Sequence, residues 1–191
     1  MANCICVLDA SILYSSALRD LVLSLAAKGL YRPIWSQLIH DEWMRNLTAN
    51  HGGGAAIRGH SVRTRQRMDA VFPDALIDGF QTLIPGLGLP DPNDRHVLAA
   101  AIHAGASVIV TYNLRDFPPP ELAKFGIEAW HPDEFIEFLL NADIDAALEA
   151  IHELRARLRQ PPKTQREYLE LLVKLHMPRT AQILQAHLSR F

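Results

Sequence analysis

The feature that most constrains the fold is a set of short apolar segments separated by stretches of helical length. The segment CICVL at 4–8 is apolar throughout, which is typical of a strand buried on both faces of a parallel sheet. Further strand candidates lie at 31–35, 107–111 and 127–130, with helical periodicity in the intervals. Because alternating strands and helices build parallel sheets covered on both faces, residues 1–141 are predicted to form one α/β domain.

The rest of the chain, residues 142–191, contains helical segments and no strand signal, so it is predicted to be an all-helical C-terminal extension. A stripe of apolar side chains at helical spacing runs along 143–158, and such a stripe needs a surface to pack against. Its members are Ile144, Ala147, Leu148, Ile151, Leu154 and Leu158. That surface could belong to the chain's own domain, to a second copy in a homodimer, or to another protein. Packing on its own domain is favoured.

In the first domain, helices are predicted at about 12–28, 37–49, 57–70 and 132–141, with another beginning in 91–105.

Composition narrows the class of protein only a little. The chain is 49% hydrophobic, enough for a substantial core, and its net charge of −2 indicates no partner. Its two cysteines, Cys4 and Cys6, are interpreted as small buried residues and not as a disulfide. No segment has the pattern of a signal peptide or the roughly 20 apolar residues of a membrane span. A cytoplasmic protein without a membrane partner is therefore expected.

Two carboxylates stand where apolar side chains are expected. At 100° per residue, Asp94 falls in the apolar arc of its helix together with Val97 and Leu98. Glu42 falls in the apolar arc of the helix at 37–49, whereas its neighbour Asp41 lies outside it. Each of these acids is therefore predicted to point towards the interior of the domain.

Two more acids follow strands. Asp9 comes directly after the strand at 4–8, and Asp116 follows the strand at 107–111. In an open parallel sheet, sites form outside the carboxyl ends of the strands. An Asp in such a place is often only a helix cap or a turn residue, so each acid taken singly is weak evidence of a site.

A buried carboxylate without a partner costs several kcal/mol or more, so these acids need compensation. One alternative is a salt bridge for each. The other is convergence of Asp9, Glu42, Asp94 and Asp116 on a divalent cation. Hard oxygen ligands favour Mg²⁺ or Mn²⁺, ions that activate water and stabilise phosphoryl charge. The residue pattern alone leaves both the salt bridges and the shared cation open. A shared cation points to phosphodiester hydrolysis.

The motifs VLDAS, IHDEWMRNL, DPNDRHVLAAAI and VTYNLRDF resemble, in order and spacing, those of PIN-domain ribonucleases, and most closely VapC-type toxins of bacterial toxin–antitoxin pairs. The resemblance covers about 3–137. It implies a three-layer α/β/α sandwich with a five-stranded parallel sheet, a Mg²⁺ or Mn²⁺ site, and cleavage of RNA. It also implies a cognate antitoxin as a protein partner.

The resemblance assigns roles to individual residues. Asp9, Glu42, Asp94 and Asp116 match the four acids that act as metal ligands and catalytic residues in the family. Two polar positions near the metal are matched by Ser11 and Asn113. Asp91 is either an auxiliary acid or the cap of the helix that Pro92 starts, and the cap is favoured. The helical extension is a difference from the shortest members of the family, which the resemblance does not explain.

The chain is therefore interpreted as a metal-dependent endoribonuclease, the toxin of a type II toxin–antitoxin pair. The alternatives are a PIN-fold module that binds RNA or protein without cutting, and a small-molecule phosphatase on the same sheet. The arginine-rich helix at 57–70 could be a solvated face or a mobile flap that binds phosphates. His96 and His103 lie on the polar side of their helix and are expected to be solvated.

Overall fold

A computed structural model describes residues 4–158 and 163–191. Its centre is a sheet of five parallel strands in the order β3-β2-β1-β4-β5. The strands are β1 (Ile5–Leu8), β2 (Arg32–Ser36), β3 (Leu76–Ile77), β4 (Val108–Val110) and β5 (Glu128–Trp130). The four strands expected from the apolar segments are confirmed. The fifth, β3, has only two residues, too few to produce a recognisable pattern.

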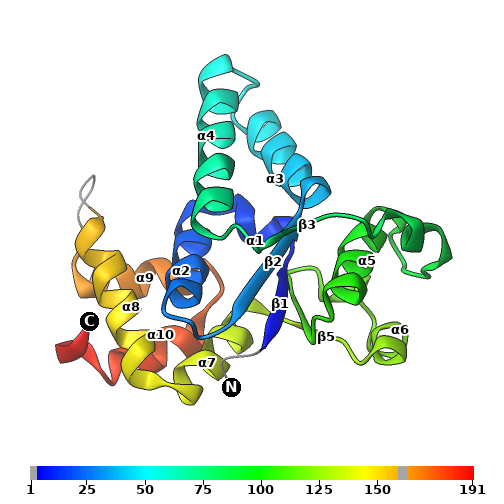
Figure 1. Ribbon diagram of the computed structural model, residues 1–191. Coiled ribbons are helices and arrows are strands. Elements are labelled where there is room, and N and C mark those ends of the chain that lie inside the picture. Colours follow the sequence, from blue (N-terminus) through cyan, green and yellow to red (C-terminus); the bar gives the residue numbers. More distant parts are fainter. Residues whose placement is uncertain (1–3, 159–162) are drawn as a thin grey trace.

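Helices fill the intervals between the strands and most of the C-terminal region (Figure 1). They are α1 (Ala10–Tyr14), α2 (Ser16–Ala27), α3 (Gln37–Asn50), α4 (Ala55–Val71), α5 (Arg95–Ala104), α6 (Pro119–Leu122), α7 (Pro132–Ala142), α8 (Ile144–Arg157), α9 (Gln165–Lys174) and α10 (Pro178–Gln185). Short 3₁₀ turns include η1 (Gln81–Gly86), η2 (Pro92–Asp94), η3 (Leu114–Asp116), η4 (Ala123–Phe125) and η5 (Leu188–Arg190).

The single helix expected at 12–28 is wrong, because two helices occupy that stretch. Ser15 leaves the helical conformation (φ −76°, ψ 117°), and its hydroxyl accepts a hydrogen bond from the backbone N–H of Leu18. A serine that caps the second helix thus ends the first one. The break leaves α1 as a short helix directly after β1, at the carboxyl end of the sheet.

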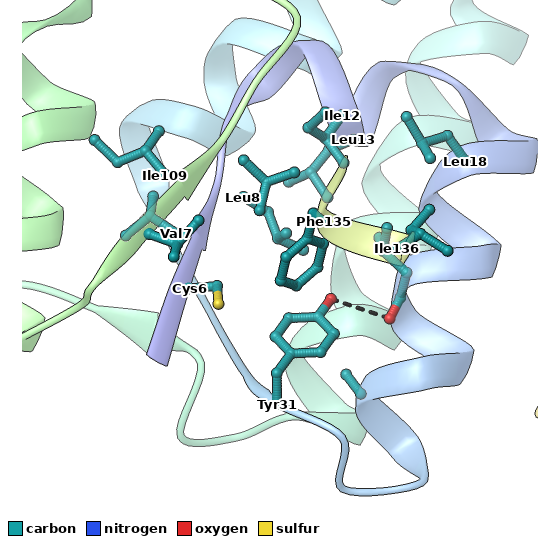
Figure 2. Packing of buried hydrophobic residues seen from close by; sticks show 14 of the residues in the cluster. Cys6, Val7, Leu8, Ile12, Leu13, Leu18, Tyr31, Ile109, Phe135 and Ile136 are labelled. Carbon is teal, nitrogen blue, oxygen red and sulfur yellow. Dashed lines mark hydrogen bonds between the residues drawn. The ribbon is translucent and has the colours of Figure 1, made fainter. Parts of the chain in front are cut away.

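The sheet is covered on both faces, which confirms the three-layer architecture (Figure 1). Helix α5 packs on one face, against β1, β2 and β4, and helices α2 and α7 lie on the other. Figure 2 shows Val7 and Ile109 on one side of the strands, with Leu8 on the opposite side near Phe135 of α7. Tyr31 packs edge-on against Phe135, and its hydroxyl donates a 3.0 Å hydrogen bond to the carbonyl of Val22.

Helices α3 and α4 project together from the carboxyl end of the sheet (Figure 1). Asp69 of α4 joins them to the core, accepting hydrogen bonds from Trp35 Nε1 and His40 Nε2 at 3.0 Å each and from Arg65 Nε at 3.3 Å. His40 Nδ1 in turn accepts from Trp43 Nε1 at 2.9 Å, so the proton of this buried ring lies on Nε2. Most of the remaining α4 surface is exposed, and both interpretations of its arginines, a solvated face and a phosphate-binding flap, stay predictions.

The described part of the C-terminal extension is helical and packs on the first domain. Helix α8 lies against α2 and α7, and its apolar stripe is buried at Ala147, Leu148, Ile151 and Leu154. Packing of this stripe on the chain's own domain is therefore confirmed. A homodimer and the division at 141/142 stay predictions, and residues 159–162 of the extension lie outside the described residues. Within the described ranges, no helix combines the length and apolar character needed to cross a membrane.

Candidate active site

Asp9 lies where β1 ends and α1 begins. Its backbone N–H donates to the carbonyl of Val110, so the pairing of β1 with β4 extends to this residue. The side chain is 3% exposed and caps α1, with Oδ1 accepting from the backbone N–H of Ala10 at 2.7 Å. Oδ2 accepts from the hydroxyls of Ser11 at 2.7 Å and Thr111 at 2.8 Å. Burial nevertheless raises the pKa of Asp9, and the charge of Glu42 adds to this increase.

Ser11 and Thr111 hold the two central strands together at this point. The Ser11 hydroxyl accepts from the backbone N–H of Tyr112 at 3.3 Å, and that of Thr111 accepts from the N–H of Asn113 at 2.9 Å. Ser11 therefore lies beside the predicted acid, as expected, whereas Thr111 was not predicted. The one signal for Thr111 was its position as the last, polar residue of an otherwise apolar strand.

Asp94 ends η2 and immediately precedes α5. Its side chain is buried, 8% exposed, and makes no capping hydrogen bond with the helix that it precedes. Burial raises the pKa of Asp94 to about 7, and four carboxylates contribute to this increase: Asp9, Asp116, Asp91 and Glu42. Asp94 is thus within electrostatic range of carboxylates from three other segments of the chain, and the convergence of the four acids on one ion stays a prediction.

Glu42 has a different environment, because it has a partner. Its Oε2 lies 3.3 Å from Nε2 of His96, a pairing between α3 and the first turn of α5. The side chain of His96 is only 13% exposed, so the expectation that it is solvated is wrong. Helix α3 packs against α5 and covers this part of the polar side. His103, on the same helix, is exposed as expected.

The remaining predicted residues lie at the edge of this cluster. Asp116 is half-buried in η3, close enough to Asp94 to raise its pKa. Asp91 caps η2, its Oδ1 accepting from the backbone N–H of Asn93 at 2.8 Å, so the expected cap is confirmed. Asn113 contributes its backbone N–H to Thr111, and its side chain is exposed.

Asp9, Glu42, Asp94 and Asp116 together are called the acidic site. Its donor atoms are carboxylate oxygens, which suit Mg²⁺ or Mn²⁺, and a cation would offset the repulsion that raises the pKa of Asp94. In the part of the chain that the structure describes, no three His, Cys, Asp or Glu side chains are close enough to form a ready metal centre. The residues fit a divalent ion in charge and ligand type, and binding one requires the carboxylates to draw closer.

Comparison with known proteins agrees with this arrangement. Residues 6–115 match the model of the PIN domain, and residues 132–186 match that of the VapC50 C-terminal domain. Over 79 residues the chain is 40% identical to a Mycobacterium tuberculosis protein named "Putative ribonuclease VapC50". That alignment covers 41% of this chain and 47% of the relative, so the chain spans about half the length of the curated protein that it matches. No solved structure matches significantly.

The two family matches divide the chain in a way that follows the structure. The first runs from β1 into η3 and contains Asp9, Glu42 and Asp94 of the acidic site, whereas Asp116 lies one residue beyond it. The second runs from α7 to α10 and thus includes the last helix on the sheet, helices α8 and α10 that pack on it, and α9, which packs on α10. From its sheet order, its motifs and the matched region, the chain belongs to the PIN-domain family.

Proposed function

We propose that this chain is a metal-dependent endoribonuclease of the VapC type, with RNA as its substrate and a cognate antitoxin as its protein partner. The observation that carries the proposal is the environment of Asp94, a buried carboxylate whose pKa is raised by burial and by the charges of carboxylates from three other segments of the chain. Such an arrangement destabilises the fold unless a cation is bound, so it is best understood as a binding site. The proposal includes a cytoplasmic location, where RNA and an antitoxin would both be met.

Each acid has a distinct task in this proposal. Asp9 is held rigidly by Ser11, Thr111 and the start of α1, so it would fix the position of the ion. Asp94 and Asp116 would supply further oxygens. When bound, Mg²⁺ or Mn²⁺ activates water and stabilises negative charge on the phosphate.

Glu42 is suited to proton transfer. Its side chain is 26% exposed and touches His96, so it can take a proton from the attacking water and release it to solvent. His96 would keep the Glu42 carboxylate oriented while the other oxygen remains available. This division assigns Asp9 to rigid positioning and Glu42 to the acid–base step.

The test is cleavage of single-stranded RNA oligonucleotides by the purified chain with Mn²⁺ or Mg²⁺, compared with the same reaction in EDTA. We expect cleavage only with the ion, and a loss of about 100-fold or more in Asp9→Asn, in line with the removal of one electrostatic group from an active site. Asp41→Asn is the matched control, because Asp41 is an exposed acid beside Glu42 whose partner is Gln37.

Other outcomes decide between the alternatives. RNA binding without cleavage at any ion concentration would identify a non-cutting module. Hydrolysis of small phosphomonoesters without cleavage of RNA would identify a phosphatase. Cleavage that persists in EDTA, or an Asp9→Asn variant as active as Asp41→Asn, would overturn the proposed site.

A further inference from the structure

A groove of about 790 Å³ lies next to the acidic site. Ser11 lines it while also donating to Asp9, so the groove and the site share a wall. The walls come from α1 and the start of α2, from α3 and α4, from the loop after β4, and from the end of α9 with the turn that follows it. Its aromatic and basic side chains include Tyr14, His51, His60, Tyr112, Lys174 and His176.

The character of this lining is opposite to that of the acidic site. None of the described residues around the groove is an Asp or a Glu, although Ser11 hydrogen-bonds directly to Asp9. Lys174, His51 and His60 are exposed or half-exposed at its edges, as is His176. A polyanion that approaches the carboxylates from this side therefore meets hydrogen-bond donors and the positive charge of Lys174.

Both tyrosines are held in place. The hydroxyl of Tyr14 accepts from Asn50 Nδ2 at 3.2 Å, and that of Tyr112 donates to the carbonyl of Leu175 at 2.7 Å. Tyr112 also packs edge-on against His131, with ring centroids 5.0 Å apart. Fixed, half-buried aromatic rings suit the stacking of nucleic acid bases, because little side-chain entropy remains to be lost on binding.

The turn after α9 is held in an unfavourable backbone conformation. His176 has a φ of 58°, in the left-handed region that favours glycine. The turn is tied to the first domain by the Tyr112 bond to Leu175, and the start of α10 is anchored by Asp133. A histidine kept at a glycine-like position keeps an imidazole at the edge of the groove, which a glycine could not supply.

We propose that this groove binds the RNA strand on one side of the scissile phosphate, with Lys174 and His176 of the C-terminal extension contacting phosphates and Tyr14 and Tyr112 stacking with bases. The inference rests on the proposed function and deepens it, since it makes the extension part of the substrate site. Single-stranded RNA fits better than a folded protein, because two aromatic rings, a lysine and three histidines line a groove that adjoins the acidic site at Ser11.

The experiment measures binding apart from cleavage. A fluorescein-labelled single-stranded RNA 12-mer of mixed sequence is titrated with the full chain carrying Asp94→Asn, and anisotropy is followed at several salt concentrations. In this background, Lys174→Ala with His176→Gly is expected to weaken binding about tenfold. The slope of log affinity against log salt should become shallower by about 0.7 for each phosphate that the variant no longer neutralises. Tyr14→Leu, which keeps bulk but removes the ring, should weaken binding roughly fivefold or more.

Arg166→Ala is the matched control. Its side chain is 89% exposed on the same helix as Lys174, it does not line the groove, and its removal takes away one positive charge, as Lys174→Ala does. Its affinity should stay within about twofold of the parent chain. His176→Gly removes the left-handed strain, so thermal melting of each variant shows whether the fold is intact.

The outcomes separate this inference from the function on which it rests. If the Lys174/His176 variant binds RNA with the affinity and salt slope of Arg166→Ala, the groove is not an RNA site. The groove is likewise not an RNA site if the Lys174/His176 variant binds RNA normally and is defective only in binding an antitoxin. If that variant loses RNA affinity but the wild-type chain never cleaves RNA, the groove stands and the proposed nuclease function fails.

Discussion

Asp94 and Asp133 are both buried aspartates near the start of a helix, yet their surroundings are opposite. Asp133, 5% exposed, accepts three hydrogen bonds: from the backbone N–H groups of Arg179 at 3.0 Å and Thr180 at 2.8 Å, and from the Thr180 hydroxyl at 2.8 Å. Asp94, 8% exposed, makes no side-chain capping hydrogen bond, and its pKa is raised by burial and, to a smaller extent, by four carboxylates.

We infer from this difference that Asp133 is a structural carboxylate and that Asp94 is a functional one. The carboxylate of Asp133 accepts hydrogen bonds from donors at the start of α10, which compensate for its burial and anchor α10 to α7. The charge of Asp94 is repelled by its neighbours, so its burial costs stability in the absence of a cation. We infer that the two sites respond in opposite ways to the loss of a carboxylate.

The largest effect is expected for Asp94→Asn. RNA cleavage should fall by about 100-fold or more, since a group that stabilises developing charge is lost. The metal-free variant should melt at the same temperature as the wild-type chain or higher, because one repelling charge is gone. Cleavage rates and melting curves measured on the same preparation check both parts. A variant that fails to fold would mean that Asp94 is a structural acid like Asp133.

Asp133→Ala should have the reverse profile. Three donors at the start of α10 lose their acceptor, which should lower the free energy of unfolding by about 2–4 kcal/mol. Denaturant unfolding measures this change. Glu134→Ala is the control, because Glu134 lies in the same helical turn but is exposed, and its loss should cost well under about 1 kcal/mol. If Asp133→Ala and Glu134→Ala lowered the free energy of unfolding equally, Asp133 would not be a structural carboxylate and its contrast with Asp94 would be wrong.

Addition of Mg²⁺ or Mn²⁺ should stabilise the wild-type chain. An ion at about 100 times its dissociation constant adds roughly 2.7 kcal/mol to the free energy of unfolding if it binds only the folded state. The increase should be absent or much smaller in Asp94→Asn and retained in Asp133→Ala. An equal increase in all three chains would show that the ion binds elsewhere.

A smaller effect is expected from pH. Because the pKa of Asp94 is raised from 3.8 to about 7, the folded chain binds more protons than the unfolded chain between those values. The free energy of unfolding should therefore decrease as the pH rises from about 4 to about 7 in EDTA, and the raised pKa of Asp9 contributes in the same direction. Denaturant unfolding across this range should show a shallower dependence in Asp94→Asn. An unchanged slope would contradict the assignment.

The sequence predicts best what depends on local pattern. Four strands follow from apolar runs, and the position of Asp94 in an apolar arc correctly indicates a buried acid. Local pattern does not predict β3, because its two residues form a strand only by pairing with β2. The break at Ser15 was missed because the flanking residues continue a helical pattern, while the hydroxyl of Ser15 caps a new helix.

Site residues whose roles depend on distant neighbours were also missed. Thr111 reaches Asp9 only because β1 and β4 are adjacent, a contact between residues 102 positions apart. Helical periodicity places His96 on the polar side of α5, and it is largely shielded from solvent because α3 brings Glu42 onto that side. These roles arise from tertiary packing, so periodicity within one helix or strand cannot reveal them.

The central claim is that the acidic site holds a divalent cation against the mutual repulsion of its carboxylates. The most direct test is an NMR titration of the Asp94 carboxyl carbon with and without Mg²⁺. The account predicts an apparent pKa near 7 in EDTA, moving well below that value when Mg²⁺ is saturating, because the cation favours the charged form. An apparent pKa near 4 in EDTA, or a titration that Mg²⁺ leaves unchanged, would contradict it.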